Sequence, residues 1–176
     1  NMLYAFIEGP DDERFFNWLF KNKGLEYKPI LYARKKQKDI NKYISSINAM
    51  PDSEYILIAD ADSKGVEEKK NIVNERYYRS SKDNIYIVQN EIESWFLAGL
   101  NIVQSQKLKV KNLANTDKIT KEDFIGLFKG ESKVEVMQRI LEIYDVETAI
   151  EKNTTFKLFL ESRVFKWLCR YHTGPS

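Results

Sequence analysis

An apolar run that ends in two carboxylates constrains the fold of this chain more than any other stretch. Residues 55–62 read YILIADAD. A continuous apolar run of this kind is typical of a strand buried in a parallel sheet. Alternate side chains of an extended backbone share a face, so we expect Asp60 and Asp62 to point the same way at the strand end. Two carboxylates this close repel unless a cation lies between them, and a hard divalent ion such as Mg2+ suits oxygen ligands.

The rest of the first hundred residues alternates between strand and helix patterns. Short apolar segments predict three more strands, over 3–7, 27–32 and 85–88. Helical spacing and terminating Gly or Pro residues predict helices over 13–21, over the segment that ends before Pro51, over 66–79 and over 91–100. This alternation predicts βαβ units in an α/β fold, with a mostly parallel four-stranded sheet flanked by helices.

The pattern changes after residue 100. From 101 to about 132 the chain is rich in Lys, Asn and Thr and has weaker periodicity. Two later helices are expected, over 134–144 and 156–171. The sequence therefore predicts an α/β domain over residues 2–100 and a mainly helical extension or cap over 101–176, packed on that domain.

Composition excludes several classes of protein. One cysteine rules out an internal disulfide, and one histidine argues against a Cys/His zinc site. The formal charge of +2 does not by itself indicate a nucleic-acid partner, so any basic surface must be local. No apolar run has the length of a membrane span and no leader pattern precedes the first strand, so we expect a cytoplasmic protein without membrane contact. The oligomeric state is left open.

Charged side chains follow every predicted strand. Ligands of an open parallel sheet bind outside the carboxyl ends of its strands, so these residues are expected at one edge. Acids follow the first, third and fourth strands, and a basic cluster follows the second. In chain order the candidates are Glu8, then Arg34, Lys35, Lys36 and Lys38, then Asp60, Asp62 and Lys64, and then Glu91 and Glu93.

Two of these segments resemble the Toprim domain of topoisomerases, primases, recombination proteins and several nucleases. FIEGPDD at 6–12 and LIADADSKG at 57–65 match its glutamate-glycine pair after the first strand and its DxD after the third. Over residues 3–99 the resemblance implies a Rossmann-like fold that uses Mg2+ for phosphodiester chemistry. It implies that Glu8 acts as general acid/base or metal ligand, and that Asp60 and Asp62 are catalytic metal ligands.

EIESWFLAG at 91–99 is similar to a segment of the overcoming-lysogenization-defect (OLD) type nucleases and of small phage-defence Toprim proteins. That resemblance implies two further ligands, Asp12 and Glu91, and so a site for one or two Mg2+ or Mn2+ ions. The chain lacks the GxxxxGK[ST] motif of an ATPase. An ATPase would therefore be a separate partner, unless the protein acts alone.

Each candidate also has a structural interpretation. Asp60 and Asp62 can cap the following helix, and Asp12 lies where the helix dipole favours acids. Asn90 and Glu93 have capping-box spacing, which makes Glu93 less favoured as a ligand than Glu91. The basic residues, Arg34, Lys35, Lys36, Lys38 and Lys64, are either phosphate contacts or a solvated surface.

The leading functional hypothesis is a Mg2+-dependent Toprim nuclease or nickase that hydrolyses phosphodiester bonds of DNA or RNA. Its metal would activate water, Glu8 would handle a proton, and Lys and Arg side chains would position the backbone. A non-catalytic Toprim module that binds nucleic acid or regulates an ATPase partner is an alternative. A nucleotide-sugar glycosyltransferase also uses a DxD after a strand, although it gives Glu8 no role.

Overall fold

The computed structural model describes residues 2–172. Contacts between Cα atoms divide the chain into two compact units. Of the described residues, the sheet unit contains 2–59, 64–87 and 159–172, and the helical unit contains 60–63 and 88–158. None of the helices in the described part of the chain is long and apolar enough to cross a membrane.

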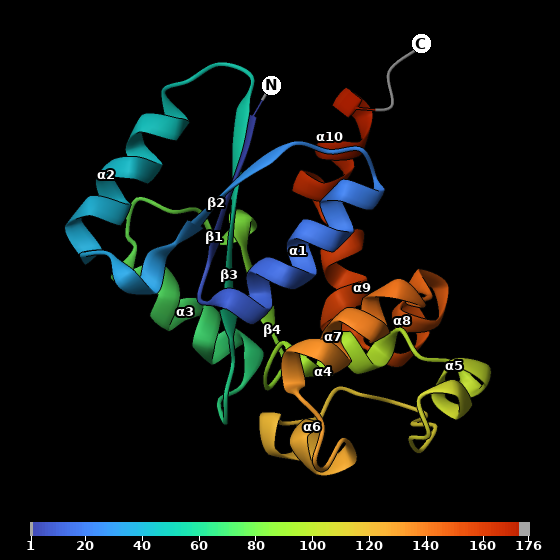
Figure 1. The fold of residues 1–176 in the computed structure, drawn as a ribbon. Coiled ribbons are helices and arrows are strands. Elements are labelled where there is room, and N and C mark those ends of the chain that lie inside the picture. Colours follow the sequence, from blue (N-terminus) through green and yellow to red (C-terminus); the bar gives the residue numbers. More distant parts are fainter. Residues whose placement is uncertain (1, 173–176) are drawn as a thin grey trace. The chain divides into compact units, whose positions relative to one another are not determined.

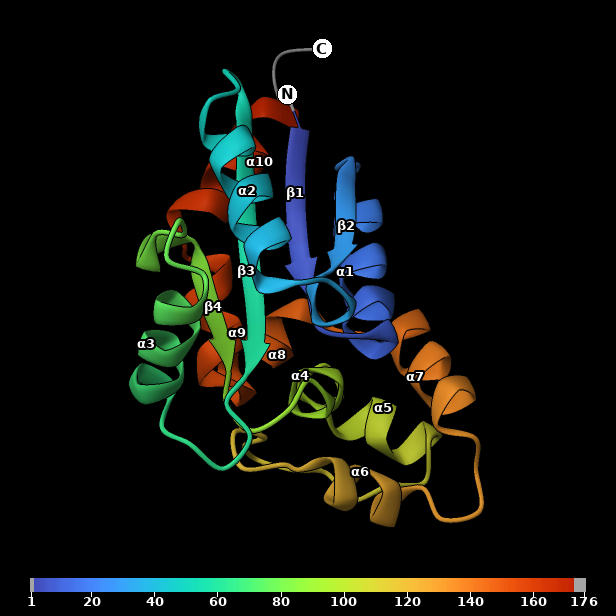
Figure 2. The same cartoon turned by 90° about the vertical axis from the view of Figure 1, so that its left-hand side faces the viewer.

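Four parallel strands form one sheet, as the arrows in Figure 2 show. They are β1 (Met2–Ile7), β2 (Tyr27–Leu31), β3 (Ser53–Asp60) and β4 (Ile85–Val88). Their order is β2-β1-β3-β4, and β1 pairs in parallel with both β2 and β3. The predicted α/β class with a four-stranded parallel sheet is confirmed. Because the strands are parallel, their carboxyl ends lie at one edge of the sheet.

Helices cover both faces of this sheet (Figure 1). On one face lie α1 (Pro10–Asn22) and α10 (Arg163–His172), and on the other α2 (Gln37–Asn48) and α3 (Val66–Arg76). Proline at the first position and acids in the first turn favour the start of α1. Its apolar stripe is fully buried and includes Phe16, whose ring lies 5.7 Å from that of Phe159. On the opposite face, the ring of Tyr4 in β1 packs edge-on against that of Tyr43 in α2, with 5.9 Å between the ring centres.

The helical unit is built around a short buried helix, α4 (Glu93–Ala98). The ring of Trp95 packs 5.2 Å from that of Phe156, and the hydroxyl of Tyr144 donates to the carbonyl of Trp95 at 2.6 Å. A Cβ atom at Gly99 would lie 2.2 Å from the Tyr144 ring, so only glycine fits there. The other helices are α5 (Ile102–Lys107), α6 (Lys121–Leu127), α7 (Lys133–Glu142), α8 (Val146–Lys152) and most of α9 (Thr154–Leu160).

The single helix predicted over 156–171 is wrong. Two helices cover this segment, α9 and α10, because the helix is interrupted between Leu160 and Arg163. The hydroxyl oxygen of Ser162 accepts a hydrogen bond from the backbone N–H of Phe165 at 3.2 Å. A serine in this position satisfies an otherwise unpaired donor in the first turn, so it starts a new helix instead of continuing the old one.

Candidate functional site

The DxD segment lies beside the segment that follows β4. Asp60 is the last residue of β3, and the next two backbone N–H groups donate to the last residue of β4 and to that segment. Ala61 donates to the carbonyl of Val88 at 2.8 Å, and Asp62 donates to that of Asn90 at 2.9 Å. All of these residues belong to the helical unit. The chain thus brings the two acids of the DxD and Glu91 onto neighbouring loops.

A left-handed turn occurs in both loops. Asp62 has a φ of 55° and Asn90 a φ of 57°. Only glycine, and less readily Asp or Asn, adopts this conformation at low cost. The backbone is therefore no longer extended at Asp62, and the alternation of a strand does not set the direction of its side chain. The Asp62 side chain is exposed, whereas Asp60 is half-buried.

Glu91 and Glu93 differ in their surroundings. The Glu91 carboxylate accepts a hydrogen bond from the backbone N–H of Lys121, the first residue of α6. Glu93 is 4% exposed and forms an ion pair with Lys133, with 2.6 Å between Oε1 and Nζ. Ile92 is the N-cap of α4, so the capping box predicted for Asn90 and Glu93 does not form. Glu93 instead joins the start of α4 to the start of α7.

Glu8 follows β1 in the sheet unit and contacts a tyrosine that the sequence did not single out. The hydroxyl of Tyr32 lies 3.1 Å from Oε1 of Glu8 and 2.8 Å from the carbonyl oxygen of Ile58. Burial raises the pKa of Tyr32 well above its usual value, and the nearby charges of Glu8 and Asp12 add to the shift. Tyr32 therefore stays protonated and remains a donor. In the sequence, the only indication of this role for Tyr32 was its position at the end of an apolar predicted strand.

Asp12 is buried in the first turn of α1. Its Oδ2 atom accepts a hydrogen bond from the backbone N–H of Gly9 at 3.2 Å. This contact satisfies a backbone donor at the helix start, where the dipole also favours a negative charge. Asp12 thus has a clear structural role, and metal ligation by it stays a prediction.

The predicted basic residues are exposed in the sheet unit. Arg34 ends a short 3-10 helix (Tyr32–Arg34), and Lys64 lies in the loop after the DxD. Lys38 lines a pocket of about 240 Å3 between α2 and the chain beyond α3. Lys42, Tyr78 and Arg79, which the sequence did not single out, also line it, together with Asn41 and Ser45. The last two candidates, Lys35 and Lys36, lie between the 3-10 helix and α2.

Tyr78 gives this basic pocket an aromatic surface. Its side chain is 65% exposed, and the guanidinium of Arg79 lies 5.4 Å from its ring centre. Cations beside an exposed ring are typical of surfaces that bind phosphates and stack bases.

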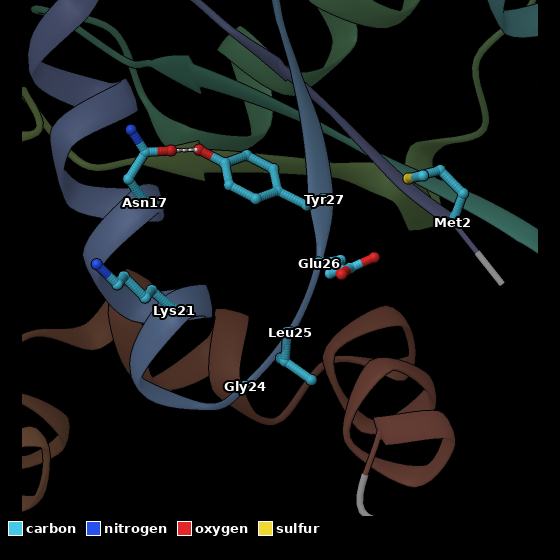
Figure 3. A pocket seen from close by; sticks show the side chains of 7 residues that line it. All are labelled: Met2, Asn17, Lys21, Gly24, Leu25, Glu26 and Tyr27. Carbon is cyan, nitrogen blue, oxygen red and sulfur yellow. Dashed lines mark hydrogen bonds between the residues drawn. The ribbon is translucent and has the colours of Figure 1, made fainter.

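A separate pocket of about 690 Å3 lies at the amino ends of β1 and β2 (Figure 3). Its lining includes Met2, Lys21 and Tyr27, and the Tyr27 hydroxyl donates to the amide oxygen of Asn17. Ligands of parallel sheets bind at the opposite, carboxyl ends. None of the predicted site residues lines this pocket.

The structure therefore groups the candidates by unit. Glu8 and Asp12 surround Tyr32 in the sheet unit, and the DxD lies beside Glu91 in the helical unit. Among the described residues, no three acidic, histidine or cysteine side chains form a group that could hold a metal ion. Comparison with protein-family models, curated proteins and solved structures gives no match to this chain.

Proposed function

We propose that this chain is a Mg2+-dependent, Toprim-type nuclease that hydrolyses phosphodiester bonds of DNA or RNA. One observation carries the proposal most directly: the DxD that ends β3 is hydrogen-bonded to the loop that follows the neighbouring strand β4. The carboxyl ends of neighbouring parallel strands are where such sheets bind ligands. The motif therefore has the structural context that its proposed role requires.

The donor chemistry of these loops fits Mg2+. Asp60 and Asp62 offer carboxylate oxygens, which hard divalent ions prefer. Mg2+ keeps several of its waters and is commonly held by one or two carboxylates together with substrate phosphates. In this proposal Asp60 and Asp62 are the main ligands, and ligation by Glu91 and by Asp12 stays a prediction from the resemblance. When bound, Mg2+ or Mn2+ would polarise the scissile phosphate and lower the pKa of a bound water.

Glu8 is proposed to hold and release a proton. The Tyr32 hydroxyl has one hydrogen, which serves either Ile58 or Glu8. If Glu8 carries a proton, it can donate to the Tyr32 oxygen while Tyr32 donates to Ile58. Both protonation states of Glu8 thus have a hydrogen-bonding partner, which suits a general acid/base.

The basic residues are proposed to contact phosphates. Arg34, Lys38 and Lys64 are exposed, and Lys38 shares its pocket with Lys42 and Arg79. Phosphate contacts of this kind position a nucleic-acid backbone without reading its sequence. Glu93 is left out of the site, because Lys133 neutralises its charge.

A cleavage assay tests the proposal. Plasmid DNA, single-stranded DNA and RNA are incubated with the protein and Mg2+ or Mn2+, and the variants Asp60→Asn and Glu8→Gln are compared with the wild type. Glu161→Gln, which alters an exposed carboxylate between α9 and α10, is the matched control. We expect the two site variants to lose about 100-fold or more in rate, a typical effect for acid-base or metal-binding groups. Equal cleavage by all four proteins would exclude the proposed site.

The basic pocket beside Tyr78 favours one alternative, a non-catalytic Toprim module that binds nucleic acid, alone or with a separate ATPase. This alternative predicts nucleic-acid binding that the Asp60→Asn and Glu8→Gln substitutions leave intact. It also predicts no metal-dependent cleavage by the wild type. The same four proteins therefore distinguish the two functions.

A further inference from the structure

Two hollows adjoin at the carboxyl end of α6 in the helical unit. The first has a volume of about 470 Å3, and Lys107, Lys109 and Lys129 are among its lining residues. The second has a volume of about 500 Å3, and its lysines are Lys111 and Lys118. Gly126 and Leu127 of α6 line both hollows. Together these five lysines, which we call the lysine tract, line two hollows that share two residues of α6.

The acids near the tract are mostly engaged in other contacts. Asp117 accepts hydrogen bonds from the backbone N–H and the hydroxyl of Thr154, at 2.8 and 2.7 Å. Asp123 accepts from the backbone N–H of Thr120 at 3.0 Å, and Glu131 pairs with Arg139. Two acids, Glu122 and Asp123, line the second hollow beside its two lysines, whereas Glu131 is the one acid among the described residues that line the first hollow.

Of these contacts only the ion pair of Glu131 with Arg139 neutralises a charge, because the donors to Asp117 and Asp123 are neutral. Within the described part of the chain, none of the five forms an ion pair with an acidic side chain. Lysine ammonium groups that outnumber the neighbouring carboxylates, as in the first hollow, create a positive potential that attracts polyanions. The chain as a whole carries a formal charge of only +2, so this positive surface is local.

The position of α6 relates the tract to the DxD loop. Its first residue, Lys121, donates to Glu91, which lies on the loop beside Asp62. Both hollows include Gly126 and Leu127 at its other end, and the second hollow extends back along the helix to Glu122. A helix of this length spans roughly 10 Å, and phosphates along one strand of a duplex are about 3.4 Å apart along the axis. A strand in the tract would thus reach the Glu91 loop within about three phosphates.

We propose that the lysine tract binds the sugar–phosphate backbone of a nucleic-acid strand and leads it toward the DxD loop. The inference rests on the proposed function for its class of substrate, although binding in the tract needs no metal. Lysines act as point charges on phosphates and carry no base readout, so the binding is expected to be independent of sequence. It is also expected to weaken steeply as salt displaces the strand.

The test is a binding assay on the full chain without divalent ions. Fluorescence anisotropy measures affinity for labelled single-stranded DNA, duplex DNA and RNA at several salt concentrations. The variant carries Lys109→Gln, Lys118→Gln and Lys129→Gln. Its matched control carries Lys28→Gln, Lys82→Gln and Lys157→Gln, which remove the same charge from exposed positions elsewhere.

We expect the tract variant to lose at least tenfold in affinity for the preferred nucleic acid. The slope of log K against log salt should fall by roughly two to three, because each lost phosphate contact removes about 0.7 to 0.9. The control should stay within about twofold of the wild type at physiological salt, since exposed charges outside the contact are largely screened. Thermal unfolding followed by circular dichroism verifies that both variants fold.

Three results would overturn the inference. The two triple variants lose affinity equally, or the wild type binds none of the three nucleic acids, or it binds phosphatidylserine vesicles in their place. Adding Mg2+ separates this inference from the proposed function. Binding without cleavage would support the binding role of the lysine tract and contradict the proposed nuclease function. Wild-type cleavage rates in the tract variant would support the nuclease function and contradict the binding role of the tract.

Discussion

The hydroxyl of Tyr32 lies 3.1 Å from the carboxylate of Glu8, across a separation of 24 residues. The same hydroxyl reaches the backbone of β3 through Ile58 at 2.8 Å. Tyr32 therefore fixes the glutamate after β1 against the strand that carries the DxD. In the proposed nuclease Tyr32 is a positioning residue.

Replacement of Tyr32 by phenylalanine removes the donor and keeps the ring. The carbonyl of Ile58 loses a buried partner, so the free energy of unfolding should fall by about 1 to 3 kcal/mol in urea titrations. The pH–rate profile of cleavage should shift, with the KM for nucleic acid unchanged. Tyr86→Phe is the control, because it removes a hydroxyl that donates to the carbonyl of Asp83 at 2.9 Å. An unaltered profile in Tyr32→Phe would remove its positioning role.

Buried tyrosines should make the protein sensitive to alkaline pH. Burial raises the pKa of Tyr144 well above its usual value, and Tyr32 shifts in the same direction. Below about pH 10 both folded and unfolded tyrosines are neutral, so their contribution to stability is fully present. As pH rises further the unfolded chain ionises first, and stability falls by up to about 1.4 kcal/mol per pH unit for each group.

Urea unfolding between about pH 8 and about pH 11, which covers the ordinary titration range of tyrosine, measures this loss of stability. Tyr144→Phe should make the decline shallower, because it removes one group that titrates. Tyr78→Phe, at a side chain that is 65% exposed, should leave the wild-type slope. Parallel slopes for all three proteins would contradict the prediction.

The left-handed turn at Asn90 predicts an unusual order of substitutions. Glycine adopts a φ of 57° without strain, so Asn90→Gly should be neutral or slightly stabilising. Asn90→Ala should cost about 1 kcal/mol, because its Cβ meets the following carbonyl. Denaturant titration of both variants measures their free energies of unfolding. An alanine variant as stable as the glycine variant would show that the backbone at residue 90 leaves the left-handed conformation without cost. Either result also reports on the loop that holds Asp62.

The ion pair of Glu93 and Lys133 is predicted to be structural. Glu93→Gln removes the charge of a side chain that is 5% exposed and that pairs with Lys133, whose side chain is 23% exposed. We expect a loss of about 1 to 3 kcal/mol, below the cost for a fully buried pair. The double variant Glu93→Gln, Lys133→Gln should lose less than the sum of the single variants. An additive double-mutant cycle would show that the two side chains do not interact.

The sequence indicated the elements that depend on local pattern. The apolar run before Asp60 and the alternation of strands and helices sufficed to predict the parallel sheet, and with it the position of Glu8 after β1. The left-handed turn at Asp62 was not predicted, because it depends on a hydrogen bond to Asn90 from another loop. Such a partner is invisible to a periodicity that extends over only a few residues.

Contacts distant in sequence account for the rest of the unpredicted site. Lys133 is 40 residues from Glu93, so the capping-box spacing near Asn90 was the only local signal, and the wrong one. The lysine tract was visible only as a Lys-rich stretch. Its two hollows are assembled from residues between Lys107 and Arg139, a span that local periodicity does not relate.

The chain passes between the sheet unit and the helical unit at four points, so neither unit is a continuous segment. Residues 60–63 of the helical unit separate the first two segments of the sheet unit. Residues 64–87 of the sheet unit separate the two segments of the helical unit, and residues 159–172 belong to the sheet unit again. No single truncation can release either unit whole, and neither can be transplanted as a cassette. A simple fusion or deletion therefore cannot add or remove one whole unit. The DxD loop and the sheet must be inherited together.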